Sequence, residues 1–298
     1  MLAGKRLLIT GVATRHSIAH AIACEAQNAG AEVILTSFGR MRSMTERSVG
    51  TLPRPAPVLE LDVAVPAHFD ALRDRILSEY GSLDGAVHAI AWAPEEALGG
   101  RFLDASWDSV LDALATSAFS FKALARALAP TFLHGRGSLV GLDFDASVAW
   151  PLYDWMGVCK GALESISRYL ARYLGEQGTR VNLIAAGPIV TPTANGIPGF
   201  SELVELWGYQ APLGWNSRDP RPIARAACFL LSDWAEGITA EILHVDGGFH
   251  AMAAPFPERM PGQRLFAPAE GSGGKVGGES PDSGGPGSAV RRAPGSPR

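Results

Sequence analysis

Short runs of apolar residues alternate along the chain with longer stretches in which apolar positions recur at helical spacing. Most of the short runs are apolar at consecutive positions, which is typical of strands covered on both faces. They predict strands at Arg6–Thr10, Glu32–Thr36, Pro57–Leu61, Gly85–Ile90, Ser138–Leu142, Val181–Ile184 and Glu241–Val245. The longest predicted helices cover Ala105–Ala129 and Pro151–Gln177. This alternation predicts an α/β fold with a doubly wound, mostly parallel sheet of seven strands.

Two segments depart from this rhythm. Residues 191–210 are rich in turn-forming residues and contain one short helical stretch, Ser201–Trp207. A loop of that length inside a compact domain is more often functional than not. From Ala254 onward, Gly, Pro and Ser dominate without periodicity, and such a composition cannot bury a core. We therefore predict one Rossmann-like domain over residues 1–253, with a substrate-binding loop at 191–210, and a disordered tail over 254–298.

Composition excludes several classes of function. The chain has 298 residues and a net charge of −4, so no excess of basic residues indicates nucleic-acid binding. Cys24, Cys159 and Cys228 have no paired spacing, which predicts neither a disulfide framework nor a metal site and fits a reducing compartment. The first residues lead directly into a predicted strand without a signal peptide, and no apolar run reaches the length of a membrane span. We expect a cytoplasmic protein.

The segment from Tyr153 to Lys160 contains the most distinctive chemistry. In a helix, residues seven positions apart return to one face after two turns, about 10 Å along the axis. A nearby ammonium favours the phenolate and makes the phenol a better donor to a developing oxyanion. An isolated pair of this kind is more often a buried Tyr and a solvated Lys, so its interpretation depends on the rest of the chain.

A candidate nucleotide site follows the first predicted strand. The strand leads into Gly11 and then, through Ser17, into a predicted helix, and a helix N-terminus after a glycine turn can bind an anion through its free N–H groups. Ser17 is placed to cap that helix or to hydrogen-bond a phosphate. Only Gly11 of the GxGxxG pattern is present, so this segment alone is more typical of an ordinary turn between a strand and a helix.

Five motifs occur together in a characteristic order. They are Gly11-x5-Ser17-Ile-Ala, Tyr153-x6-Lys160, Asn182-Leu-Ile-Ala-Ala-Gly-Pro-Ile, Leu230-Leu-Ser-Asp-Trp and His244-Val-Asp-Gly-Gly. Over residues 1–253 the chain resembles the enoyl-acyl-carrier-protein reductases of the short-chain dehydrogenase superfamily, most closely the actinobacterial type that includes the mycobacterial isoniazid target. Ordinary short-chain dehydrogenases carry Tyr-x3-Lys, and the wider spacing places the phenol about 4.5 Å further from the lysine along a helix.

This resemblance implies a reaction and a set of residues. In the family, a nicotinamide cofactor donates hydride to C3 of a trans-2-enoyl thioester, a tyrosine stabilises the enolate, and a proton is added at C2. The implied catalytic residues are Tyr153, Lys160, which would hydrogen-bond the nicotinamide ribose, and Phe144, which would lie on the substrate side. The implied cofactor-binding residues are Gly11, Ser17, Ile18, Phe38, Asp62, Val63, Ile90, Ala91, Lys160, Gly187, Pro188, Ile189 and Thr191. The predicted substrate-binding residues are Trp92, Phe144, Tyr153, Met156, Phe200, Leu203 and Trp207. Of these, the last four could form an apolar groove for an acyl chain together with Trp150, although each of them alone is more typical of ordinary packing.

The resemblance favours NADH but leaves NADPH open. Gly39 stands where the mycobacterial enzyme has an acidic residue, so no carboxylate at the end of the second predicted strand is placed to bind a ribose 2′-hydroxyl. Arg15, Arg40 and Arg42 could accept a 2′-phosphate, or they could simply be solvated.

The substrate would be a thioester of acyl-carrier protein or coenzyme A. The loop at 191–210 is shorter than in the mycobacterial enzyme, so we expect short to medium acyl chains. The resemblance also implies a homotetramer and a role in fatty acid biosynthesis. Two alternatives remain: a specialised paralogue in secondary metabolism or an inhibitor-insensitive copy with the same catalytic residues, and a dinucleotide-binding sensor without turnover.

Overall fold

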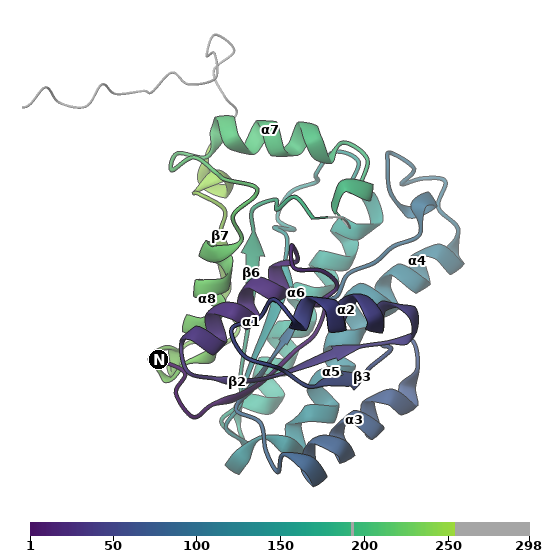
Figure 1. Cartoon of the computed structure of the whole chain (residues 1–298). Coiled ribbons are helices and arrows are strands. Elements are labelled where there is room, and N and C mark those ends of the chain that lie inside the picture. Colours follow the sequence, from purple (N-terminus) through teal and green to yellow (C-terminus); the bar gives the residue numbers. More distant parts are fainter. Residues whose placement is uncertain (192–193, 254–298) are drawn as a thin grey trace, which may run out of the picture. The chain divides into compact units, whose positions relative to one another are not determined.

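The computed structural model describes residues 1–191 and 194–253, and its centre is a sheet of seven parallel strands (Figure 1). The strands are β1 (Arg6–Ile9), β2 (Glu32–Ser37), β3 (Val58–Glu60), β4 (Gly85–His88), β5 (Ser138–Asp143), β6 (Arg180–Ala186) and β7 (Ile242–Val245). Their order is β3-β2-β1-β4-β5-β6-β7, and each neighbouring pair is parallel. The predicted fold class is confirmed.

Helices cover both faces of the sheet, which explains why the strands are apolar at consecutive positions. Leu7 and Ile9 of β1 pack in one core with apolar residues of α1 (Ile18–Asn28) and α8 (Arg221–Leu231). Leu8, between them, packs in a second core with residues of α3 (Pro66–Glu79), α5 (Ser120–Leu128) and α6 (Asp154–Gly175). Alternate side chains of one strand are therefore buried in different cores. The remaining helices are α2 (Arg42–Val49), α4 (Trp107–Leu114) and α7 (Phe200–Gln210).

Two predicted helices have different boundaries in the structure. The predicted helix Ala105–Ala129 is interrupted by a π-helical stretch, Ala115–Phe119, between α4 and α5. The predicted helix Pro151–Gln177 begins only at Asp154, so Tyr153 is its N-cap residue. Leu152 has a positive φ of 63°, which a right-handed helix does not allow. The short predicted helix Ser201–Trp207 lies within α7.

The carboxyl ends of the parallel strands meet at one edge of the sheet, where ligands bind in doubly wound folds. Asp143 ends β5 and His88 ends β4, while Thr10 follows β1 and Gly187 follows β6. The motifs recognised in the sequence are thus brought to a common edge. Within the described ranges, no helix is long and apolar enough to cross a membrane. The predicted tail, residues 254–298, lies outside the described residues.

Candidate active site

Lys160 of α6 and Asp143 at the end of β5 are both buried, and each influences the charge of the other. Both residues are only 5% exposed. Lys160 Nζ donates a hydrogen bond of 2.8 Å to the carbonyl oxygen of Leu142. Burial raises the pKa of Asp143 to about 7, and the charge of Lys160 opposes this rise. Burial lowers the pKa of Lys160, and Asp143 opposes this fall. Each residue therefore helps to keep the other charged in a site with little solvent.

Tyr153 lies immediately before the helix that carries Lys160. Burial raises the pKa of its phenol, and Asp143 and Cys159 raise it further. Our expectation that Lys160 shifts this group toward the phenolate is wrong, because a buried phenolate loses its hydration and here faces a carboxylate. Tyr153 is therefore a neutral hydroxyl at neutral pH, which suits it to donate a hydrogen bond.

His88 adds a neutral imidazole at the end of β4. Its Nε2 lies 2.7 Å from Ser120 Oγ, and Ser120 Oγ donates to the carbonyl oxygen of Thr116 at 2.6 Å. Since that hydroxyl has one proton, His88 Nε2 must be the donor, and Nδ1 is left unprotonated. Burial, together with the charge of Lys160, lowers the pKa of His88 to about 3. Among the described residues, His88 Nδ1 and both Asp143 carboxylate oxygens are buried without a hydrogen-bond partner.

The turn after β1 requires glycine. Gly11 has a φ of +79°, and a Cβ at this position would lie 1.9 Å from the carbonyl oxygen of Ala89. Ser17 is the N-cap of α1, where its Oγ accepts from the N–H of His20 at 3.3 Å and donates to Thr14 at 2.7 Å. The capping role considered for Ser17 is therefore present, and its contact with a phosphate stays a prediction. Ile18 begins the helix, so its N–H group lies in the first turn, where no intrahelical acceptor exists.

A different group of residues surrounds the ends of β2 and β3. Phe38 follows β2 and is 41% exposed, so its ring is free to stack against a base. Asp62 follows β3, and its carboxylate accepts from the N–H of Ala64 at 3.0 Å while its own N–H donates to His68 Nδ1. Val63 packs at the margin of the core shared with α3.

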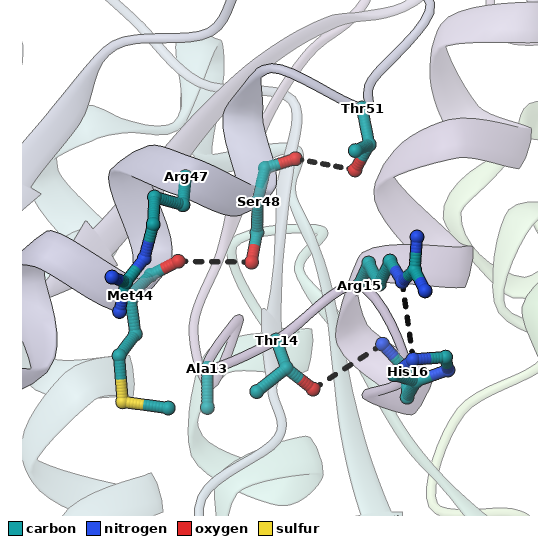
Figure 2. Close-up of a pocket in the computed structure, with 8 residues that line it drawn as sticks. All are labelled: Ala13, Thr14, Arg15, His16, Met44, Arg47, Ser48 and Thr51. Atoms are coloured by element: carbon teal, nitrogen blue, oxygen red, sulfur yellow. Dashed lines mark hydrogen bonds between the residues drawn. The ribbon is translucent and has the colours of Figure 1, made fainter.

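A basic hollow of about 250 Å³ lies beside the turn after β1 (Figure 2). Arg15 and His16 approach it from the turn, and Arg47 approaches it from α2. Arg15 Nε donates to His16 Nε2 at 3.1 Å. The other lining residues are Ala13, Thr14, Met44, Ser48 and Thr51, so the lining contains no carboxylate. Positive charge beside this turn favours an anionic ligand.

The segment after β6 is buried under two indole rings. A Cβ on Gly187 would lie 2.6 Å from the ring of Trp215 and 3.0 Å from Trp207 Nε1, so only glycine fits there. Pro188 is buried, and its carbonyl oxygen accepts from Trp215 Nε1 at 2.8 Å. Ile189 belongs to the core shared with α1.

Thr191 ends this described segment, and its hydroxyl accepts from the N–H of Ala194 at 3.1 Å. Of the residues expected in the substrate loop, 192–193 lie outside the described ranges.

Aromatic side chains from distant segments meet in front of Tyr153. The Phe144 ring centroid lies 5.2 Å from that of Tyr153, 5.0 Å from Trp150 and 5.5 Å from Trp207. Trp207 is 2% exposed and stacks on Phe249 at 3.8 Å. Its Nε1 donates to the carbonyl oxygen of Asp246 at 2.9 Å. Leu203 packs against the same group. This aromatic cluster attaches α7 to the segment after β7.

The remaining substrate candidates are more dispersed. Met156 is buried beside Leu98 and Cys159, with Tyr153 packed against them. Phe200 is 9% exposed at the start of α7. Trp92 is 52% exposed, and its backbone is held by Ser117 of the π-helical stretch through hydrogen bonds of 2.8 Å and 2.7 Å. Ile90 is half-buried and Ala91 is exposed in the segment between β4 and Trp92.

These residues fit a dinucleotide. A glycine turn and a helix N-terminus follow β1, and an exposed aromatic ring follows β2. Lys160 uses one of its three donors on Leu142. Buried polar atoms of Asp143 and His88 face the same neighbourhood without a partner among the described residues. A ligand with hydroxyl, amide and phosphate groups matches this set of donors and acceptors.

Comparison with known proteins agrees with this geometry. A model of the family described as enoyl-(acyl carrier protein) reductase matches residues 11–250. The chain is 44% identical to the enoyl-[acyl-carrier-protein] reductase [NADH] of Mycolicibacterium smegmatis, over 83% of this chain and 97% of that protein. It is also 44% identical to the corresponding protein of Mycobacterium avium, with the same coverage, and 37% identical to that of Bacillus subtilis, over 85% and 98%. The chain belongs to the enoyl-acyl-carrier-protein reductase family.

As a member of this reductase family, the chain gathers many of the predicted site residues at one edge of the sheet. Phe144 and Tyr153 are in contact, and Lys160 lies on the adjoining helix. Sequence reasoning placed His88 only within a segment expected under the adenosine ribose and pyrophosphate, and it assigned no role to Asp143 and Phe249. A polar residue at the end of a buried strand was the available signal for Asp143. Phe249 had no such signal, because its contact with Trp207 depends on tertiary folding.

Proposed function

We propose that this protein reduces the trans-2 double bond of an enoyl thioester with NADH, in fatty acid biosynthesis. The observation that carries the proposal is the contact of the Tyr153 ring with Phe144, at the start of the helix that also carries the buried Lys160. Family membership and the printed names of the relatives, which specify NADH, support the same reaction.

In this mechanism, Tyr153 binds the carbonyl oxygen of the thioester. The cofactor, when bound, would supply the hydride that is added to C3 of the substrate, and a proton added at C2 would complete the reduction. Negative charge then develops on the carbonyl oxygen, and a neutral hydroxyl donor in a site with little water stabilises it more strongly than water does. The raised pKa of Tyr153 keeps the proton on the phenol, so the phenol acts as a hydrogen-bond donor during charge development.

Lys160 contributes binding and charge. One of its donors is fixed on Leu142, which orients the ammonium and leaves two donors for ribose hydroxyls. Asp143 supports the charged form of Lys160. Phe144 and Trp150 exclude water from the space next to the phenol. This exclusion strengthens the hydrogen bond to the developing enolate.

The test is turnover of a medium-chain trans-2-enoyl thioester, followed by nicotinamide absorbance. Replacing Tyr153 by Phe removes the donor and is expected to lower kcat about 10²- to 10³-fold. Tyr169→Phe is the matched control, because Tyr169 lies on the same helix and is 63% exposed. Full activity of Tyr153→Phe, or an equal loss in both variants, would refute the assigned role.

Four finer points remain proposals: short to medium acyl chains, the carrier, a homotetramer and a cytoplasmic location. The chain-length proposal is supported by the way α7 packs, since the buried Trp207 closes the space beside Phe144. Preferred turnover of very long acyl thioesters would overturn it. Offering the same acyl group on acyl-carrier protein and on coenzyme A distinguishes the carriers.

A further inference from the structure

The end of β2 lacks the acidic residue that dinucleotide-binding folds commonly place there. In such folds a carboxylate at this point binds a ribose 2′-hydroxyl, whereas a nearby arginine accommodates a 2′-phosphate. Here β2 ends at Ser37 and is followed by Phe38 and Gly39. The end of strand β2 therefore supplies no carboxylate to accept a hydrogen bond from the ribose.

The neighbouring strand brings a carboxylate to the same place. β2 and β3 pair in parallel with Ser37 opposite Glu60. Glu60 Oε1 accepts a hydrogen bond of 3.2 Å from the N–H of Gly39. Its side chain is 44% exposed, so a ligand can reach the carboxylate. The acid missing after Phe38 is thus replaced in space by one that lies 21 positions further along the chain.

Arg42 fixes the position of Glu60. Arg42 Nη1 lies 3.4 Å from Glu60 Oε2, and Arg42 Nη2 donates to the carbonyl oxygen of Val58 at 3.1 Å. Arg42 Nε donates to Glu46 Oε1 at 2.9 Å. Because this guanidinium already donates to two carboxylates, Arg42 is poorly placed to bind a 2′-phosphate. Its role here is to hold Glu60 beside Gly39.

We propose that Glu60 is the residue that selects NADH in this protein. Its carboxylate accepts hydrogen bonds from the adenosine ribose hydroxyls and repels the 2′-phosphate of NADPH. This inference rests on the cofactor of the proposed function. Arg40 follows Gly39, is exposed and forms no ion pair within the described part of the chain, so its charge partly offsets the repulsion. The selection is therefore expected to be a matter of degree, about ten- to a hundredfold in favour of NADH.

The experiment measures the Kd of NADH and of NADPH separately, by nicotinamide fluorescence, with the full chain. Glu60→Gln is expected to lower the ratio of Kd for NADPH to Kd for NADH by about tenfold or more, since it removes both the acceptor charge and the repulsion. Glu46→Gln is the matched control, because it also removes one negative charge beside Arg42 without touching Gly39. In Glu46→Gln, the ratio of Kd for NADPH to Kd for NADH is expected to change less than about twofold.

A second variant tests whether the carboxylate itself is what matters. Gly39 has a φ of +44°, and a Cβ there would meet no atom within 4 Å, so Asp fits in this left-handed conformation. Gly39→Asp in the Glu60→Gln background is expected to restore the preference for NADH. Thermal unfolding of each variant confirms that the fold is intact.

Three results would overturn the proposal. They are an unchanged ratio in Glu60→Gln, an equal shift in Glu46→Gln, and a wild-type protein that does not prefer NADH. The proposed reduction is tested separately by turnover. A protein that binds NADH through Glu60 but reduces no enoyl thioester would refute the reaction and support this inference.

Discussion

Asp143 has a carboxyl group that the fold buries next to Lys160, and its titration should be visible in stability. Burial raises its pKa from 3.8 to about 7, so between these values the folded protein binds more protons than the unfolded chain. The free energy of unfolding should therefore fall as pH rises through this window, by up to about 1.4 kcal/mol per pH unit. Asp143→Asn should lack this slope.

The measurement is urea unfolding of wild type and Asp143→Asn at intervals from pH 4 to pH 8. The comparison must be between variants, because His88 contributes the opposite sign. Its pKa is lowered to about 3, so it increases stability as pH rises toward 6.5. His88 is present in both proteins and cancels in the difference. Parallel pH profiles would contradict the raised pKa of Asp143.

A substitution at Gly11 tests whether the turn after β1 lies as close to Ala89, which follows β4, as the structure shows. Gly11→Ala should cost about 1–2 kcal/mol for the left-handed backbone and about 1–3 kcal/mol more for the contact with Ala89. Gly81→Ala is the matched control, because Gly81 has a φ of +77°, close to the +79° of Gly11, but open space around a Cβ. Denaturant unfolding compares them. Equal losses would mean that the turn relaxes without cost.

At the scale of elements, the attachment of α7 to the rest of the protein depends on the buried indole of Trp207. Trp207→Ala removes its stacking on Phe249 and its hydrogen bond to Asp246, and should lower the free energy of unfolding by about 3–5 kcal/mol. Backbone amides of α7 should exchange with deuterium faster than in wild type. Trp234→Ala is the control, because Trp234 is 75% exposed and its replacement should change the free energy of unfolding by less than about 0.5 kcal/mol. Unchanged protection of α7 would contradict this attachment.

The start of α6 shows where sequence reasoning succeeds and where it fails. The apolar spacing after Tyr153 correctly predicted a long helix that carries Lys160. The boundary was wrong because a distant loop determines it: Asp154 Oδ2 accepts from the N–H groups of Gly100 and Arg101 at 2.6 Å and 3.0 Å. Asp154 itself has a φ of 44°. Local spacing contains no information about a contact with residues that lie more than 50 positions earlier.

Glu60 was missed for the same physical reason. The sequence correctly showed that no acid follows Phe38, but the acid that lies there comes from the next strand. Recognising it requires the strand order and the register of Ser37 with Glu60, which are properties of the assembled sheet. Tyr153 and Lys160 could be identified earlier because their spacing within one segment is itself the signal.

For the whole molecule, the seven strands and both large cores lie within residues 1–253. The sequence places the compositional change at Ala254, and the family model ends its match at residue 250. All the residues assigned to catalysis and cofactor binding also precede this point. Removal of the residues after 253 is therefore a test of the predicted domain boundary.

A chain truncated after Met260 should therefore fold and turn over enoyl thioester as the full chain does. Its midpoint of thermal unfolding is expected to agree within a few degrees, because a change of about 1 kcal/mol shifts the midpoint of a protein of this size by about 2–4 °C. The same samples, examined by sedimentation, also report whether both chains form the proposed homotetramer. Loss of folding or a change of assembly on truncation would show that the tail takes part in the structure, and the boundary at residue 253 would have to be abandoned. Equal stability, assembly and turnover would establish that residues 1–260 contain everything that the reaction requires.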